Sequence, residues 1–158
     1  MAEQKQFIQL SVFDRLASMP DDGIIGSRVS DIQIVRSSVL RDVENLLNTR
    51  RSIIEPPANY RYLNESMFVY GLEDFVAQNP KNPNVRKALK RSIYATINKF
   101  EPRLQNVSVD FNEEEGNEHN LCFTVTATLY ADPIHEPIFF DTWFSVNRGE
   151  YTIKNVKT

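Results

Sequence analysis

The stretch KFEPRLQNVSVDF, residues 99–111, joins two periodic patterns and decides the fold. Pro102 lacks a backbone N–H and disfavours a helical residue before it, so a helix must end at Glu101. Between Arg103 and Phe111 the chain begins to alternate apolar with polar residues, which is typical of a half-buried strand. The tripeptide Glu101-Pro102-Arg103 is therefore predicted to join a helix to a sheet.

A long amphipathic helix is predicted before this junction. Asn82 can cap it, and Pro83 suits the first helical position. Its apolar residues form one stripe at helical spacing, Val85, Leu89, Ile93, Ile97 and Phe100. The opposite face carries Arg86, Lys87, Lys90 and Arg91. We interpret this basic face as a solvated surface, with contact to an acidic neighbouring protein as the alternative.

A second amphipathic helix is predicted earlier in the chain. Ser37 or Ser38 can cap it, and its apolar stripe is Val39, Val43, Leu46 and Leu47. The helix should end near Arg50 and Arg51, whose charges complement the helix dipole. Phosphate binding is the alternative role for this pair of arginines.

An antiparallel meander is predicted after the junction. Its strands are expected at residues 107–111, at 121–129, from 138 to a tight turn at 147–149, and at 151–156. One face of such a sheet must be covered, and the two striped helices are the available cover. The sequence therefore predicts an α+β, two-layer domain in which two main helices cover an antiparallel β-meander, with an N-terminal extension.

The connection between the two helices, residues 55–74, is rich in proline and aromatic residues. Pro56 and Pro57 forbid a continuing helix, and Gly71 suits a turn with positive φ. Its aromatic residues are expected to lie over the core with their hydroxyls in water. They are Tyr60, Tyr62, Phe68 and Tyr70. A sugar-stacking platform is the alternative.

The N-terminal residues differ in character from the rest. Residues 7–19 have apolar positions at helical spacing, among them Leu10, Phe13 and Leu16. This short helix either folds back on its own domain or binds a partner, and the pattern does not separate the two. We assign residues 1–35 to an N-terminal partner-binding extension and linker, and residues 36–158 to one domain.

Composition limits the function classes. The chain has 158 residues and a formal net charge of −3, so it has no general attraction for nucleic acid or anionic membranes. Its single cysteine, Cys122, cannot form an internal disulfide, and the N-terminus lacks a secretory signal. No window is long and apolar enough to span a membrane. We expect a cytoplasmic protein without direct membrane contact and without a nucleic-acid partner.

We expect no metal and no cofactor. Two histidines and one cysteine do not provide a zinc-type ligand cluster. An acidic run near His119 could be mistaken for a cation or acid-base site, and consists of Glu113, Glu114, Glu115 and Glu118. Adjacent glutamates around a glycine are more typical of a solvated hairpin tip.

Three segments resemble a known family. They are SVLRDVENLLNTRRS (38–52), FVYGLEDF (68–75) and INKFEPRLQNVSVDF (97–111). In this order and spacing they resemble the lysozyme-like baseplate wedge family of contractile injection machines, and LSVFDRL near the start is similar to the N-terminal segment of its type VI secretion members. The chain departs from the family pattern at residues 71–74, where it has Gly-Leu-Glu-Asp and relatives carry Gly-Leu-Pro-Asp.

The resemblance implies a structural component of a type VI secretion system baseplate that docks the contractile sheath onto the baseplate wedge. It implies the wedge subunits TssF and TssG and the sheath subunits TssB and TssC as partners. On this template Glu101, Pro102 and Arg103 match a motif linked to seating the sheath. The segment that would contact the wedge contains Leu10, Phe13 and Leu16. The alternative in this class is the equivalent wedge protein of a phage tail or a related contractile particle.

The family name also raises the alternative of a peptidoglycan-cleaving lysozyme. Glycoside hydrolysis usually needs two carboxylates about 5–10 Å apart, one of them a weak acid. Glu101 is the first candidate, but Asp110 and Asp141 fall on predicted strands and neither is marked as the second. Arg103 would moreover lower the pKa of Glu101 and weaken it as a general acid. We therefore expect no enzymatic activity.

Docking has a physical reason to use this junction. Pro102 restricts the backbone, so Glu101 and Arg103 keep a set orientation and lose less freedom on binding. Arg103 can bind a partner carboxylate with two hydrogen bonds. Alternatively, Glu101 and Arg103 pair within the domain and only fix the junction. An exposed sheet edge, at residues 151–156 or 107–111, is a second docking route.

Overall fold

The computed structural model describes residues 28–75, 78–79, 82–117, 120–131 and 134–157. Side chains are described throughout these ranges except at residues 28–31, 113–117, 131, 134 and 155–157. The helix predicted at residues 7–19, including Leu10, Phe13 and Leu16, lies outside the described residues. The acidic run and His119 lie outside the described side chains.

Helices occupy the first part of the described chain. They are α2 (Arg28–Asn48), α3 (Arg61–Asn64), the 3-10 helix η1 (Met67–Val69) and α4 (Pro83–Phe100). The start of α4 is as predicted, because the Asn82 side chain accepts a hydrogen bond from the backbone N–H of Asn84 at 2.9 Å and Pro83 follows the cap. The stripe of α4 faces inward, with Leu89, Ile93 and Ile97 buried.

Four antiparallel strands form one sheet in the order β1-β2-β3-β4. They are β1 (Leu104–Asn117), β2 (Asn120–Ala131), β3 (Ile134–Ser145) and β4 (Glu150–Lys157). The first register pairs of β1 and β2 are interrupted between Gln105 and Ser108, where Asn106 has a φ of 52°. This bulge bends β1 directly after the junction.

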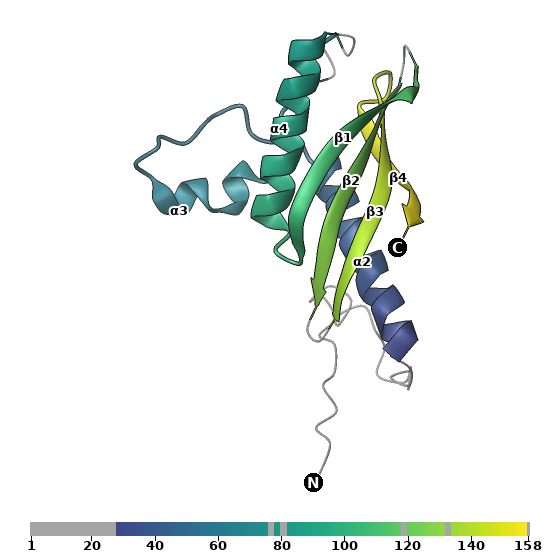
Figure 1. Cartoon of the computed structure of the whole chain (residues 1–158). Helices are drawn as coiled ribbons and strands as arrows, with labels where there is room; N and C mark the ends of the chain where they lie inside the picture. The colour runs from purple at the N-terminus through teal and green to yellow at the C-terminus, as the bar shows by residue number, and fades with distance from the viewer. Residues whose placement is uncertain (1–27, 76–77, 80–81, 118–119, 132–133, 158) are drawn as a thin grey trace.

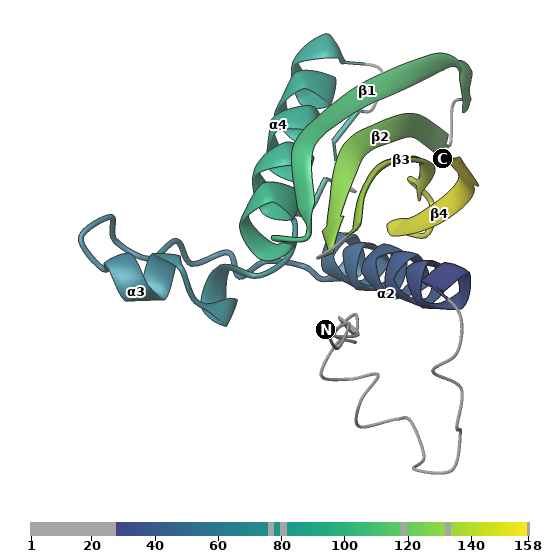
Figure 2. The ribbon, with the colours of Figure 1, turned by 60° about the horizontal axis from the view of Figure 1, so that its bottom comes forward.

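Both long helices cover the same face of the curved sheet (Figure 1). Figure 2 shows α4 beside β1 and α2 beneath the β4 side, and each helix contacts the strand nearest to it and the other helix. The layers share one core, in which Val39, Ile93, Phe123 and Phe140 are fully buried. The predicted α+β domain, an antiparallel meander under two main helices, is confirmed.

The start of the first helix differs from the prediction. α2 begins at Arg28, inside the segment assigned to the N-terminal extension, and not at a cap formed by Ser37 or Ser38. The Ser37 hydroxyl donates to the Ile34 carbonyl at 2.8 Å within the helix, and Ser38 is buried. A serine that bonds to the preceding turn does not stop a helix, which is why its residue type alone was misleading.

Two strands are longer than predicted. β1 continues to Asn117 through residues predicted as a loop, and β3 begins at Ile134 rather than at Ile138. In both places the backbone pairs with β2, as in the partners Asn117↔Asn120 and Thr128↔Pro137. Cross-strand pairing therefore extends the ladder over polar and proline-containing sequence that has low strand propensity by itself.

The connection between α2 and α4 projects from the body, and this corrects the prediction for its aromatic residues. Residues 52–69, which we name the arm, carry α3 and η1 away from the sheet (Figures 1 and 2). Tyr60, Tyr62 and Phe68 are exposed and do not lie over the core. Only Tyr70 is held against the body, with its ring edge-to-face to Phe100 at 5.1 Å. Composition could not distinguish a connection that projects from the body from one that lies over the core, because either can be rich in aromatic residues.

Candidate functional site

The junction between α4 and β1 brings the predicted site residues together. Glu101 is the C-terminal cap of α4, and its backbone N–H donates to the Ile97 carbonyl at 2.8 Å. Its own carbonyl accepts from Leu104 at 3.1 Å, which closes a turn with Pro102 at its exposed corner. Pro102 therefore ends the helix and directs the chain into β1, as predicted.

Arg103 folds back onto Glu101. The guanidinium donates from Nε to Glu101 Oε1 and from Nη2 to Glu101 Oε2, both at 2.6 Å, and the backbone N–H of Arg103 donates to Oε1 at 3.3 Å. This is a two-pronged ion pair across a two-residue turn. Glu101 is only 4% exposed, so the pair anchors the turn to the core.

The same guanidinium connects the junction to α2. Arg103 Nη2 also donates to Asp42 Oδ2 at 2.7 Å, and Asp42 lies on α2. The hydrogen bond to Glu101 is the main cause that raises the pKa of Arg103; burial, the next largest effect, lowers it, and the hydrogen bond to Asp42 raises it further. Burial, followed by the charges of Asp42 and Glu101, raises the pKa of the nearby Tyr70 phenol. The junction is thus a charged tie among α2, α4 and β1.

Part of the tie remains accessible. Pro102 is exposed and the Arg103 side chain is 28% exposed, whereas Glu101 is sealed. The remaining guanidinium nitrogen, Nη1, forms no hydrogen bond with any described residue. The internal pairing that we considered as an alternative is therefore present, and a docking role at this site is left to Pro102 and the outer side of Arg103.

The two arginines after α2 hold the segment at residues 71–74. Arg51 pairs with Glu73 at 2.7 Å and with Glu55 at 3.4 Å, and Arg50 pairs with Asp74 at 3.2 Å. The ion pair between Arg51 and Glu73 supports the turn that follows Gly71. These contacts give both arginines a structural role, and neither lies in the last turn of α2, which contradicts the predicted helix-dipole role.

The two edges of the sheet differ in accessibility. On β4, the Tyr151 N–H donates to Asn48 Oδ1 and the Tyr151 carbonyl accepts from Asn48 Nδ2, both at 2.8 Å. The Ile153 N–H donates to Glu44 Oε1 at 3.2 Å. Side chains of α2 therefore close this part of the β4 edge. No described side chain caps residues 107–109 of β1 in this way.

Sequence reasoning missed several of these residues. Asp42 and Glu44 are polar residues of the predicted helix and Asn48 lies at its predicted end, and nothing local shows that Asp42 reaches the junction or that Glu44 and Asn48 reach the sheet. The exposed arm was also missed. Its most exposed apolar side chains are Ile53 at 98%, Tyr62 at 88%, Ile54 at 72% and Met67 at 70%.

Among the described residues there is neither a candidate metal site nor a candidate membrane-crossing helix. In these ranges, no group of three or more His, Cys, Asp or Glu residues is placed to hold a metal ion. Of the helices that the structure describes, none combines the length and apolar character that a membrane crossing requires.

These features define a class of protein. A rigid charged tie, an apolar arm that projects from the body and an uncapped strand edge belong to a domain that assembles with other chains through its surface.

Comparison with known proteins identifies the family. A family model described as "Baseplate wedge protein gp25" matches residues 34–134. The chain belongs to the baseplate wedge protein gp25 family, which confirms the family resemblance and makes the chain a structural baseplate protein. A search of curated proteins gave no match. Among solved structures, a chain of "The baseplate complex from the type VI secretion system" is 20% identical, with a TM-score of 0.47 over 73% of this chain and 97% of that chain.

Proposed function

We propose that the chain is the TssE component of a type VI secretion system baseplate, that it acts in the cytoplasm, and that it docks the contractile sheath onto the baseplate wedge without catalytic activity. Support comes from family membership and from the three motifs that resemble type VI members, SVLRDVENLLNTRRS, FVYGLEDF and INKFEPRLQNVSVDF. The wedge partners would be TssF and TssG, and the sheath partners TssB and TssC. The equivalent wedge protein of a phage tail is the alternative within this family.

The observation that carries sheath docking is the state of Arg103. Glu101 and Asp42 fix its guanidinium, yet Nη1 has no described partner and the side chain is 28% exposed. A preoriented guanidinium can bind a carboxylate or carbonyl of a neighbour with little further loss of side-chain freedom. Glu101 then acts as a positioning residue, because it is buried and contacts the partner only through Arg103.

Replacing Arg103 by lysine tests this role. Lysine keeps a cation for Glu101 and Asp42 but removes the planar fork and Nη1. We expect Arg103→Lys to remain folded by circular dichroism and to reduce the number of fluorescent sheaths per cell by about tenfold. Gln105→Ala, at an exposed position just beyond the turn, is the matched control. Normal sheath numbers in folded Arg103→Lys would show that docking does not use this residue.

The N-terminal segment is proposed to contact the wedge through Leu10, Phe13 and Leu16. Deleting residues 1–20 should weaken co-purification with TssF and TssG while the remaining chain keeps its circular dichroism spectrum. Deleting the last residues, 157–158, is the control for a change in length. Undiminished capture of TssF and TssG by the shortened chain would contradict the assignment.

The lysozyme alternative makes an opposite prediction. Glu101 is buried and both of its carboxylate oxygens accept hydrogen bonds from Arg103, so a sugar cannot reach it in this arrangement. We expect no clearing of peptidoglycan in a zymogram. Clearing by the purified chain that disappears in Glu101→Gln would replace the structural role by an enzymatic one.

A further inference from the structure

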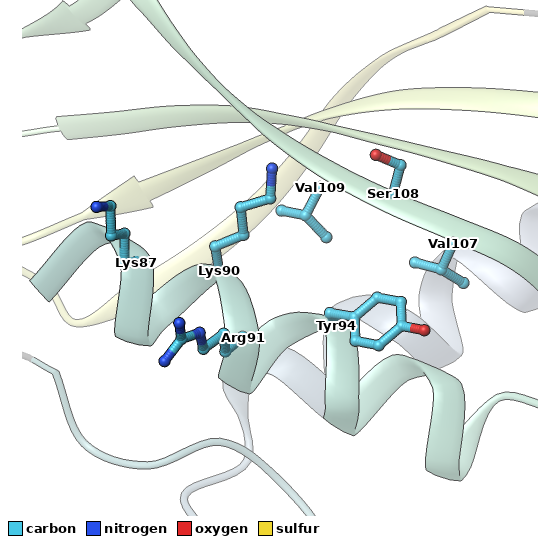
Figure 3. A pocket seen from close by; sticks show the side chains of 7 residues that line it. All are labelled: Lys87, Lys90, Arg91, Tyr94, Val107, Ser108 and Val109. Carbon is cyan, nitrogen blue, oxygen red and sulfur yellow. The ribbon is translucent and has the colours of Figure 1, made fainter. Parts of the chain in front are cut away.

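A groove of about 370 Å³ lies between α4 and the free edge of the sheet (Figure 3). α4 contributes Lys87, Lys90, Arg91 and Tyr94, and β1 contributes residues 107–109. The valines of β1 point toward α4 and form the floor, while the cationic side chains extend from the helix along the opposite wall. The groove therefore combines an apolar floor with a basic wall.

Two of the three cations in the groove have no partner among the described side chains. Lys90 Nζ is bonded to Asp110 Oδ1 at 2.8 Å, and this hydrogen bond is the main cause that lowers the pKa of Asp110. Lys87 and Arg91 are exposed and form no ion pair or hydrogen bond with a described residue. In a chain of net charge −3 this wall is locally positive.

The other wall offers backbone groups. β1 is the first strand in the sheet order, so every second N–H and C=O of residues 107–109 points away from β2. The bulge at Asn106 precedes this segment, and the Lys90–Asp110 ion pair marks its other end. On the opposite edge of the sheet, the N–H groups of Tyr151 and Ile153 already donate to Asn48 and Glu44, so they cannot pair with another strand.

We propose that this groove binds an extended, acidic segment of a neighbouring chain. Carboxylates of the segment pair with Lys87 and Arg91, its backbone runs along β1, and its side-chain stems pack on Tyr94 and the valine floor. Complementary charge selects the occupant, because a neutral or basic segment leaves both cations unpaired. The proposal rests on the assembly role proposed above and deepens it by naming the chemistry of a partner segment.

A binding titration with a synthetic probe tests the groove. The probe is a fluorescein-labelled peptide of alternating glutamate and valine, about six residues long, which is close to the usual length of a strand. Fluorescence anisotropy with the full chain should show saturable binding that weakens between low salt and about 0.3 M salt. The corresponding lysine and valine peptide should not bind.

Matched variants localise the binding. Lys87→Glu with Arg91→Glu should weaken the glutamate peptide by about tenfold or more. Arg61→Glu with Arg148→Glu makes the same change in net charge at exposed positions away from the groove, and should change the affinity by less than about twofold. Equal losses in both double variants, or no loss in the groove variant, would overturn the proposal.

Backbone contact has its own readout. N-methylation of every second residue of the peptide should weaken binding by about tenfold, because a methylated nitrogen cannot donate to β1. Amide chemical shifts of the labelled chain should change at residues 87–94 and 107–110. Chemical-shift changes confined to β4 would show that the peptide binds at the other edge of the sheet and would contradict the proposed groove. These measurements use no sheath, so their failure is distinct from failure of the sheath-docking function, which is read from sheath numbers in cells.

Discussion

The side chain of Asn48 forms two hydrogen bonds with the backbone of Tyr151, one donated and one accepted, both at 2.8 Å. An amide side chain on α2 thus takes the place of a neighbouring strand on β4. Glu44, one helical turn earlier, does the same for the N–H of Ile153. Together they make α2 a lateral cap for one edge of the sheet, and leave strand addition to β1.

Replacing Asn48 should therefore affect stability and edge pairing together. Asn48→Ala removes both hydrogen bonds and is expected to lower the free energy of unfolding by about 1–2 kcal/mol, measured by urea denaturation. Asn98→Ala, at an exposed position on α4, is the control. Light scattering should also show more self-association in Asn48→Ala, because an open edge pairs with other strands. A variant with the stability and the degree of self-association of the wild type would contradict the capping role.

The charged tie makes a separate stability prediction. Glu101→Gln removes one charge of a partly buried network, and Arg103 then keeps only Asp42 as a charged partner. We expect a loss of about 2–4 kcal/mol in unfolding free energy, because the partly buried guanidinium of Arg103 then lacks one of its two charged partners. Glu55→Gln, at an exposed ion pair with Arg51, should cost less than about 1 kcal/mol. Similar losses at the two sites would show that burial does not strengthen the tie.

The order of the elements could be predicted from sequence because local signals agree. Asn82 and Pro83 mark the start of α4, Pro102 marks its end, and the alternation after it identifies β1. The start of α2 and the full lengths of β1 and β3 could not be predicted in this way. They depend on pairing and packing with segments far along the chain, which override local propensity.

The candidate site was predicted only in part for the same reason. Glu101 and Arg103 are two residues apart, so their pairing can be proposed from the sequence. Asp42 is separated from Arg103 by 61 positions, and only the packing of α2 against the junction brings them together. The aromatic residues of the arm are predicted to lie over the core because large apolar rings are usually covered, but composition does not show where the connection between the two helices runs.

Gly71 is required by the close approach of two segments. Its φ is +100°, and a Cβ atom there would lie 2.2 Å from the Thr49 carbonyl oxygen, which also accepts a hydrogen bond from Leu72. Gly71→Ala should lower the free energy of unfolding by about 2–4 kcal/mol through clash and backbone strain. Gly149→Ala, also at positive φ, should cost about 1 kcal/mol through backbone strain alone. Equal costs would show that the Thr49 contact is unimportant.

Tyr151 should make stability fall at alkaline pH. Burial, with a smaller effect from the charge of Asp74, raises the pKa of its phenol above the ordinary value of 10.0. The folded chain therefore keeps the phenol proton where the unfolded chain releases it. The stabilisation is complete below about pH 10 and is lost as pH rises toward the folded-state pKa.

Thermal unfolding from about pH 9 to pH 11 can measure this effect. Tyr151→Phe should show a shallower fall in melting temperature than the wild type over this range, because its unfolded state has one fewer proton to release. Tyr62→Phe, at an exposed position on the arm, should follow the wild-type slope. Parallel slopes in wild type and Tyr151→Phe would exclude the phenol as a source of the alkaline sensitivity.

The arm should contribute to assembly and not to folding. Its charged groups are paired locally, as in Arg61 with Glu65 at 3.1 Å and Arg51 with Glu55 at 3.4 Å. The surface that the arm leaves for a partner is therefore mainly apolar. Ile53→Ser with Tyr62→Ser removes large exposed apolar area and should change the unfolding free energy by less than about 0.5 kcal/mol. Under the proposed function, the same double variant should lose most of its co-purification with TssF and TssG, because exposed apolar patches on soluble domains are typically covered by partners. Full capture by the folded double variant would show that the arm faces solvent in the assembled baseplate.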